Sequence, residues 1–260
     1  MSSSDIPGPL RRSRIRLDVA PGVHALTHAA TNCYLLADED GVTLVDACFA
    51  SSWPLVERAL ELTGHTPGDL RALVLTHGHF DHVGFAASLV ARRWLPVWVH
   101  PGDRRLARHP YRYRPECNRL AFPLRRPRSW PVLAAMVAAG ALRTTGVTAD
   151  HDLVDGAELP VPGRPRVLHL PGHTDGQCAL LLPDRSVLVS GDALVTLDPY
   201  TGRTGPRLVA PAATAVVATA RASVARLADV GADLLLPGHG DPWPHGVAAA
   251  ASAALRSPIG

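Results

Sequence analysis

The chain has 260 residues, 47% of them hydrophobic and 19% charged, and its formal net charge is +3. This composition is typical of a globular protein with one sizeable core, and the small charge gives no indication of a nucleic-acid or membrane-surface partner. The four cysteines form no CxxC pair, which argues against a disulfide framework or a thiolate zinc site. Because no stretch approaches the ~20 apolar residues of a membrane span, we expect a cytoplasmic protein.

The first part of the chain predicts an arm followed by an antiparallel sheet. Residues 1–14 are rich in Ser, Pro, Gly and Arg, and we expect them to form a mobile N-terminal arm. Residues 15–260 are expected to form a single domain. Short apolar runs separated by turn residues over 15–48 predict strands, and the apolar spacing of 53–62 predicts a helix with proline in its first turn.

A strand–helix–strand alternation follows, which is typical of α/β architecture. It comprises a strand at 72–75, a helix over about 83–93 and a strand at 96–100. The segment 103–149 interrupts this alternation, because it contains five prolines and one expected helix, 132–139, but no clear strand. We interpret this segment as a lid-like insertion in the domain.

Strands return in the second half of the chain. Apolar runs predict them at 166–170, 178–182, 186–190 and 232–236, with a helix at about 212–230 before the last strand. The loops that follow three of these strands contain a glycine together with a histidine or aspartate. Side chains suited to binding a metal are therefore expected to gather where strands end.

Seven histidine and aspartate side chains occupy such strand-exit loops, four of them in a single loop. They are His77, His79, Asp81, His82, His173, Asp192 and His239. Crowding so many ionisable groups costs free energy unless they bind a metal. Imidazole and carboxylate together favour zinc, with iron or manganese as alternatives, and the lack of thiolate argues against a closed structural zinc site.

The spacing within the first loop allows it to serve two adjacent metal ions. His77 and His79 can project to one side, while Asp81 and His82 project to the other. A bridging carboxylate such as Asp192, together with a bridging hydroxide, would reduce the repulsion between two cations about 3.5–4 Å apart.

Four motifs in this order, HGHFDH, PGHTDG, SGDAL and PGHG, resemble those of the metallo-β-lactamase-fold superfamily of metal-dependent hydrolases. The similarity runs from Asn32 to Gly240. It implies an α/β fold, a four-layer αββα sandwich with the metal site at one edge of the sheets. It also implies that one metal is bound by His77, His79 and His173 and the other by Asp81, His82 and His239, with Asp192 bridging them.

The same resemblance includes Asp46 in the motif LVDAC. It matches an aspartate that usually supports the site in this superfamily, and the expected physical role is to orient a ligand histidine through its free ring nitrogen. An almost equally good interpretation is a turn residue that ends the preceding strand.

The implied activity is that of a dinuclear zinc hydrolase, in which a metal-bridging hydroxide attacks a small ester, thioester or lactone. Asp81 and Asp192 are the candidate catalytic carboxylates, and Asp81 could orient the hydroxide or move its proton. The glyoxalase II-like and lactonase-like branch fits best, because β-lactamases of this fold usually carry Cys or Ser at the position of Asp192. A C-terminal glutathione-binding domain is not expected, since only twenty residues follow Gly240.

Other activities of the same fold stay open. A persulfide dioxygenase-like oxidoreductase shares the HxHxDH motif but holds a single iron. A phosphodiesterase, a β-lactam hydrolase and a non-catalytic protein are further alternatives. We expect a small-molecule substrate, no nucleic-acid or membrane partner, and a monomer or homodimer.

The lid-like insertion suggests how an anionic substrate could be held. Its residues 104–128 include nine arginines and one acidic residue, with aromatic residues interleaved. Arg125, Arg126, Tyr111 and Tyr113 are the candidate lid residues, whose guanidinium and aromatic groups would meet a carboxylate or phosphate. The alternative is a solvated basic surface in a chain whose 26 basic residues are all arginine.

Overall fold

The larger of two facing sheets is built from the first half of the chain. The computed structural model describes residues 5–259. The eight strands of this sheet lie side by side in chain order; neighbours are antiparallel from the first strand to the fifth and parallel from the fifth to the eighth. They are β1 (Asp5–Pro7), β2 (Ser13–Ala20), β3 (Val23–His28), β4 (Thr31–Asp38), β5 (Gly41–Val45), β6 (Leu70–Val74), β7 (Val97–Val99) and β8 (His151–Asp152).

The second sheet has four strands in the order β14-β11-β10-β9, and a separate hairpin lies beside it. Strands β9, β10 and β11 are antiparallel neighbours, whereas β14 runs parallel to β11. The sheet strands are β9 (Arg166–His169), β10 (Cys178–Leu182), β11 (Val187–Gly191) and β14 (Leu234–Pro237), and the hairpin strands are β12 (Val195–Asp198) and β13 (Arg203–Arg207).

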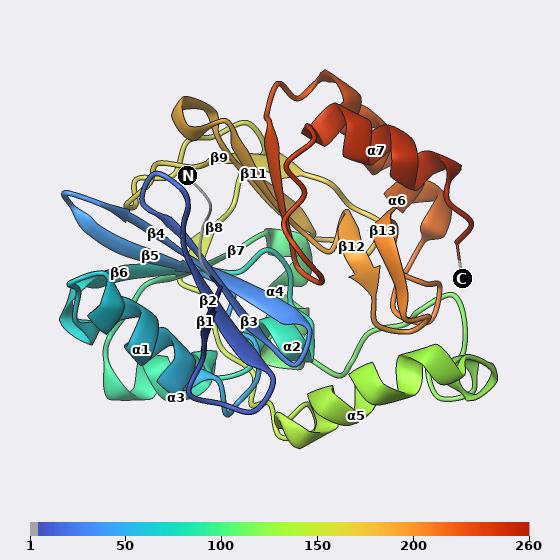
Figure 1. Cartoon of the computed structure of the whole chain (residues 1–260), viewed down its shortest axis with the longest axis horizontal. Helices are drawn as coiled ribbons and strands as arrows, with labels where there is room; N and C mark the ends of the chain where they lie inside the picture. The colour runs from blue at the N-terminus through green and yellow to red at the C-terminus, as the bar shows by residue number, and fades with distance from the viewer. Residues whose placement is uncertain (1–4, 260) are drawn as a thin grey trace.

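Helices cover the outer face of each sheet, so the molecule has the four layers predicted from the sequence (Figure 1). Successive side chains of a strand point to opposite faces of the sheet, so one strand contributes side chains to two layers of the core. In β6, Val74 packs between the sheets, whereas Leu73 packs under the helices of the first sheet. The covering helices are α1 (Trp53–Leu62) and α3 (Ala86–Arg92) on the first sheet, and α6 (Val217–Ala225) and α7 (Val247–Arg256) on the second.

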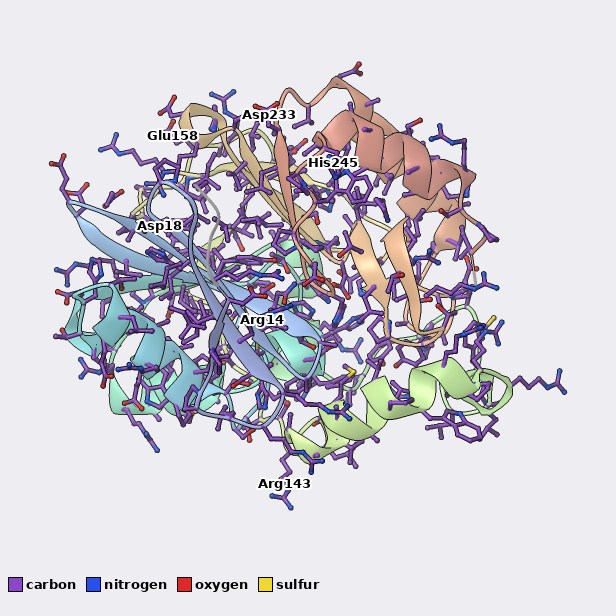
Figure 2. All side chains as sticks on the ribbon, in the orientation of Figure 1. Arg14, Asp18, Arg143, Glu158, Asp233 and His245 are labelled. Atoms are coloured by element: carbon purple, nitrogen blue, oxygen red, sulfur yellow. The ribbon has the colours of Figure 1, made fainter. Side chains whose placement is uncertain are left out.

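The space between the sheets is filled by apolar side chains from both, while charged side chains such as Arg143 point away from the body (Figure 2). Tyr34 and Val45 of the first sheet belong to the same buried cluster as Leu180 and Leu236 of the second. Burial of this interface holds the two sheets in a single unit. No helix within residues 5–259 combines the length and hydrophobicity that crossing a membrane requires.

The N-terminal segment differs from the mobile arm that was expected for residues 1–14. Residues 5–7 form β1, which pairs with β2 so that Ile6 lies opposite Ile15. The carboxylate of Asp5 also forms an ion pair with Arg16. These contacts attach residues 5–7 to the sheet, although the composition of the segment predicts a mobile arm. Residues 1–4 lie outside the part of the chain that the structure describes.

The segment 103–149 contains no strand, as expected, and is attached to the body at several points. Two backbone hydrogen bonds, from Glu116 to the Thr214 carbonyl and from Cys117 to the Pro211 carbonyl, join it to the loop before α6. Its longest helix lies near the β12–β13 hairpin (Figure 1). The elements of this segment are α4 (Arg104–Arg108), the short 3-10 turns η3 (Phe122–Arg125) and η4 (Pro127–Ser129), and α5 (Trp130–Ala138).

Two predicted helices are shorter than expected. The helix expected at about 83–93 starts at Ala86, and a separate short helix, α2 (Phe80–Val83), precedes it. The helix expected at about 212–230 is limited to α6 and the following 3-10 turn η6 (Arg226–Asp229). The residues just before α6 bind another loop, since Ala215 donates to the His173 carbonyl at 3.0 Å.

Candidate metal centre

Four of the seven predicted ligands come from the loop after β6 and the first turn of α2. His77 and His79 flank Gly78, and Asp81 and His82 lie on α2; all four side chains are buried. Gly78 is required by close packing, because a Cβ there would lie 2.6 Å from the Ala107 nitrogen. The short helix turns the chain, so ligands separated by a few residues point into one space.

The other three ligands follow the carboxyl ends of strands in the second sheet. His173 lies after β9, Asp192 after β11 and His239 after β14. These strands all run in the same direction, because β9 and β11 are both antiparallel to β10 and β14 is parallel to β11. Their exits therefore meet at one edge.

Hydrogen bonds between the two sheets bring this edge against the β6 loop. Cys178 of β10 donates its backbone N–H to the Thr76 carbonyl at 2.8 Å. The side-chain amide of Asn32 in β4 donates to the Pro237 carbonyl at 2.8 Å and to the Gly240 carbonyl at 2.7 Å. These bonds close the gap between the sheets on both sides of the site.

The predicted ligands consequently come together in overlapping groups. Within each group the potential ligand atoms all lie within 4.8 Å of one another. The groups are His77 with His79 and His173, His77 with His82 and Asp192, and Asp81 with His82 and His239.

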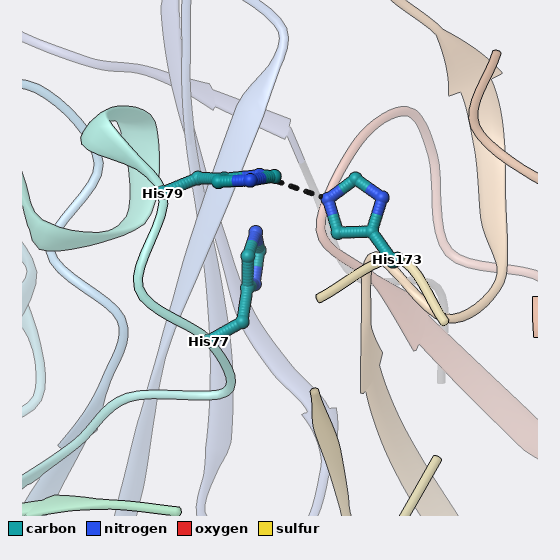
Figure 3. Close-up of side chains that lie close together, drawn as sticks. All are labelled: His77, His79 and His173. Atoms are coloured by element: carbon teal, nitrogen blue, oxygen red, sulfur yellow. Dashed lines mark hydrogen bonds between the residues drawn. The ribbon is translucent and has the colours of Figure 1, made fainter. Parts of the chain in front are cut away.

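In the first group, Nδ1 of His79 lies 3.0 Å from Nε2 of His173, so the two rings direct ring nitrogens at one another (Figure 3). The ring of His77 lies next to both, with centroids 4.8 Å from His79 and 4.9 Å from His173.

Asp192 touches both sides of the site. One of its oxygens, Oδ2, lies 3.4 Å from Nε2 of His173 and 3.2 Å from Nε2 of His239. On the far side, Nε2 of His239 also lies 3.4 Å from Oδ2 of Asp81. A single carboxylate is thus within reach of a ligand histidine from each predicted metal position.

Several buried polar atoms at the centre have no hydrogen-bond partner. They are Nε2 of His77, His79 and His82, and Oδ1 of Asp192. A buried polar atom without a partner costs about 1–3 kcal/mol, and four such atoms gathered in one place call for a common partner. Imidazole nitrogen and carboxylate oxygen are ligands of zinc and iron. The residues present therefore fit a divalent metal site.

The first histidine group is held in the neutral form that metal binding needs. Burial lowers the pKa of His77 and His79 well below the ordinary value, and the neighbouring imidazoles lower it further. Burial also lowers the pKa of His173 to about 4, although Asp192 opposes this. Neutral rings present lone pairs rather than protons to a cation.

The second group is electrostatically different. Burial lowers the pKa of His82 and His239, but the carboxylate of Asp192 and its neighbours outweigh burial and raise both above the ordinary value. The pKa of Asp192 stays well below its usual range despite burial, because His239 and His82 stabilise its charge. Two carboxylates, Asp81 and Asp192, thus lie beside the imidazole of His239.

Asp46 contacts a candidate ligand directly. Its Oδ2 lies 2.8 Å from Nδ1 of His82 and accepts a hydrogen bond from the Thr76 hydroxyl at 2.8 Å, while its Oδ1 accepts the Thr76 N–H at 2.8 Å. Asp46 also has a positive φ of 61°, which is uncommon outside glycine. The sequence left a supporting role and a turn role open, and the contacts with His82 favour the supporting one.

Asp103 was missed by the sequence analysis. Its buried carboxylate accepts hydrogen bonds from the Gly78 N–H at 2.8 Å, the Thr174 hydroxyl at 2.7 Å and the Gly176 N–H at 2.8 Å. It therefore joins the loop of His77 to the loop of His173. The available signal was its position, because Asp103 follows β7 at the same edge where the other ligands follow their strands.

Replacing Asp103 by alanine should lower the free energy of unfolding by at least about 2 kcal/mol, because two buried N–H groups lose their acceptor. Urea unfolding of the metal-free protein measures this. Asp152, an aspartate on β8 that pairs with Arg104 at the surface, provides the control; Asp152→Ala should cost less than about 1 kcal/mol. Equal costs for the two variants would contradict the assigned role.

The four predicted lid residues do not act together. Tyr113 contacts His79 in a tilted arrangement, with ring centroids 4.2 Å apart and an angle of 45° between the ring planes. Tyr111 instead stacks on Phe80 and donates its hydroxyl to a backbone carbonyl at 2.9 Å. The guanidinium of Arg126 lies over the ring of Phe122 in η3. Arg125 is exposed on the same turn. Of the four, the structure brings only Tyr113 against the metal centre.

Comparisons with known proteins agree with this architecture. Residues 26–239 match the profile of the Metallo-beta-lactamase superfamily. The chain is 29% identical to the probable metallo-hydrolase YflN of Bacillus subtilis, over 93% of this chain and 92% of that protein. It is 26% identical to an N-acyl homoserine lactonase of a Bacillus species, over 73% of this chain and 70% of the lactonase.

Among solved structures, the metallo-beta-lactamase family protein TTHA1429 from Thermus thermophilus superposes with a TM-score of 0.66. The two are 29% identical, and the match covers 90% of this chain and 78% of that chain. The chain is therefore a metallo-hydrolase that belongs to the metallo-β-lactamase superfamily.

Proposed function

We propose that this protein is a dinuclear zinc-dependent hydrolase of small esters, thioesters or lactones. The observation that carries the proposal is the position of Asp192, whose Oδ2 lies within 3.4 Å of His173 on one side and 3.2 Å of His239 on the other. A carboxylate between two ligand groups is suited to hold a pair of cations against their mutual repulsion.

The residues divide between two metal positions. His77, His79 and His173 would hold one cation, Asp81, His82 and His239 the other, and Asp192 would contact both. When bound, such a pair supplies a water-derived nucleophile at neutral pH and polarises the substrate carbonyl. Asp46 orients the His82 ring through its 2.8 Å contact with Nδ1, which presents Nε2 to the site.

Two further residues, Asp81 and Tyr113, have roles in proton transfer and in the surroundings of the substrate. The carboxylate of Asp81 lies beside His239, and in this position it can accept a proton during attack and return it to the leaving group. The Tyr113 ring lies against the His79 ring, with ring centroids 4.2 Å apart, and borders the site on that side. The similarity to an N-acyl homoserine lactonase supports an acyl substrate.

Metal content and substrate range test this proposal together. Protein reconstituted with zinc should hold about two zinc ions per chain and hydrolyse members of a panel of thioesters and lactones faster than phosphodiesters or β-lactams. Elemental analysis and initial rates give both answers. One iron per chain with oxygen uptake on a persulfide would instead identify a dioxygenase, and preferred cleavage of phosphodiesters or β-lactams would replace the proposed substrate class.

A further inference from the structure

A cavity of about 490 Å³ lies directly beside the metal centre. One wall includes the His173 ring and Tyr113. Because the Tyr113 ring contacts the His79 ring, with centroids 4.2 Å apart, this wall adjoins the first histidine group. A molecule with one end at the metals could therefore extend its other end into this cavity.

Three arginines line the same cavity: Arg105 from α4, and Arg112 and Arg114 from the following loop. The acidic residue that borders it is Asp175. Three guanidinium groups against one carboxylate leave an excess of positive charge at its walls.

These arginines have no compensating ion pair within residues 5–259. None of the three takes part in a salt bridge, whereas Arg104, the neighbour of Arg105 on α4, pairs with Asp152 at 2.6 Å. The helix thus directs one arginine to a surface acid and the next to the cavity. Guanidinium groups without protein partners can make paired hydrogen bonds to a carboxylate or phosphate.

The backbone around these arginines is held in place. The Arg112 N–H donates to the His109 carbonyl at 2.8 Å, and the Arg119 guanidinium lies 5.0 Å from the centre of the Tyr113 ring. The loop 109–116 therefore presents Arg112, Tyr113 and Arg114 as a defined surface rather than as a free arm.

We propose that this cavity binds an anionic group, a carboxylate or a phosphate, on the substrate of the metal centre. The proposal rests on the hydrolase function above and specifies its substrate class: an ester, thioester or lactone with a negative charge away from the scissile carbonyl. Hydrolysis breaks the C–S or C–O bond and adds water, its hydroxyl to the acyl carbon and its hydrogen to the leaving group. The anionic group takes no part in that step and positions the substrate.

Two matched substrate pairs test the proposal with the zinc-loaded protein. One pair carries the charge on the thiol side, S-acetyl-3-mercaptopropionate against S-acetyl-3-mercaptopropionamide. The other carries it on the acyl side, a monothioester of adipic acid against its terminal amide. The measured quantity is the ratio of kcat/KM for the anionic member to kcat/KM for the neutral member.

The double variant R105E/R112E should lower this ratio at least about tenfold for one of the pairs, and added salt should lower it in the wild-type protein. The matched control is R125E, which reverses an exposed arginine of the same segment that does not line the cavity; its ratio should stay within about twofold of wild type. A ratio that R105E/R112E leaves unchanged in both pairs would overturn the proposal.

A binding measurement separates this proposal from the proposed function. Calorimetry with adipate and with inorganic phosphate should show saturable binding to the wild-type protein that is weakened at least about tenfold in R105E/R112E and retained in R125E. The tighter of the two ligands identifies carboxylate or phosphate as the preferred group. If the wild-type protein hydrolyses no ester but binds the anion, and R105E/R112E does not bind it, the hydrolase assignment fails and the anion site stands. Equal anion binding by the wild-type protein and R105E/R112E would overturn the proposed anion site.

Discussion

Replacing Asp192 by alanine is expected to reduce the bound metal from about two ions per chain to about one and to lower kcat about a thousandfold. The reason is geometric, since Asp192 lies between His173 and His239 and touches a nitrogen of each. Elemental analysis and steady-state kinetics measure the two effects.

The control for Asp192→Ala is Asp184→Ala, in the exposed turn before β11. This variant removes an aspartate from the turn between β10 and β11 without touching the site, so metal content and kcat should match wild type. Wild-type metal content and turnover in Asp192→Ala would refute the dinuclear assignment.

Replacing Gly238 by alanine is expected to lower turnover at least about a hundredfold although no ligand is removed. A Cβ at this position would lie 2.1 Å from Oδ1 of Asp192 and 2.9 Å from Cε1 of His82. The backbone cannot move away easily, because the Gly238 N–H donates to the Gly191 carbonyl and its own carbonyl accepts from Asn32, both at 2.8 Å. The added methyl group must therefore displace a ligand, at a typical overpacking cost of about 1–3 kcal/mol.

Gly231→Ala is the matched control for Gly238→Ala, since a Cβ at Gly231 would meet no atom within 4 Å. This variant should retain wild-type metal content and unfold at the same or a slightly higher urea concentration. If Gly238→Ala also kept its full metal content and kcat, the close packing around Asp192 would not constrain the site as described.

The candidate ligands could be predicted because each lies next to a strand with a clear pattern. Leu73 and Val74 mark β6 as a buried strand, and the first candidate ligand, His77, lies three residues after its end. The four-layer αββα arrangement was predicted from the motifs and their resemblance to a known fold, and the two observed sheets confirm it.

The residues at which helices and strands begin and end depend on tertiary contacts, and the local sequence pattern does not show these contacts. The residues just before α6 are suitable for a helix, yet the backbone of Ala215 and Val216 donates to carbonyls of the His173 loop instead. Residues 1–14 were expected to form a mobile arm from their composition, but within the described part Ile6 pairs across from Ile15. In both cases the backbone N–H and C=O groups form hydrogen bonds to a partner outside the segment, and local propensity does not predict that partner.

The sequence by itself determined the kind of chemistry, because histidines, aspartates and glycines at strand exits follow from local patterns that are read over a few residues. It also showed an excess of arginine in 104–128. Only the tertiary structure decided which arginines line the cavity beside the metal centre: Arg105 and Arg112 do, and Arg125 lies on η3 away from its lining. The physical reason is that composition counts charges, whereas the lining of a cavity depends on how segments far apart in the chain pack against each other.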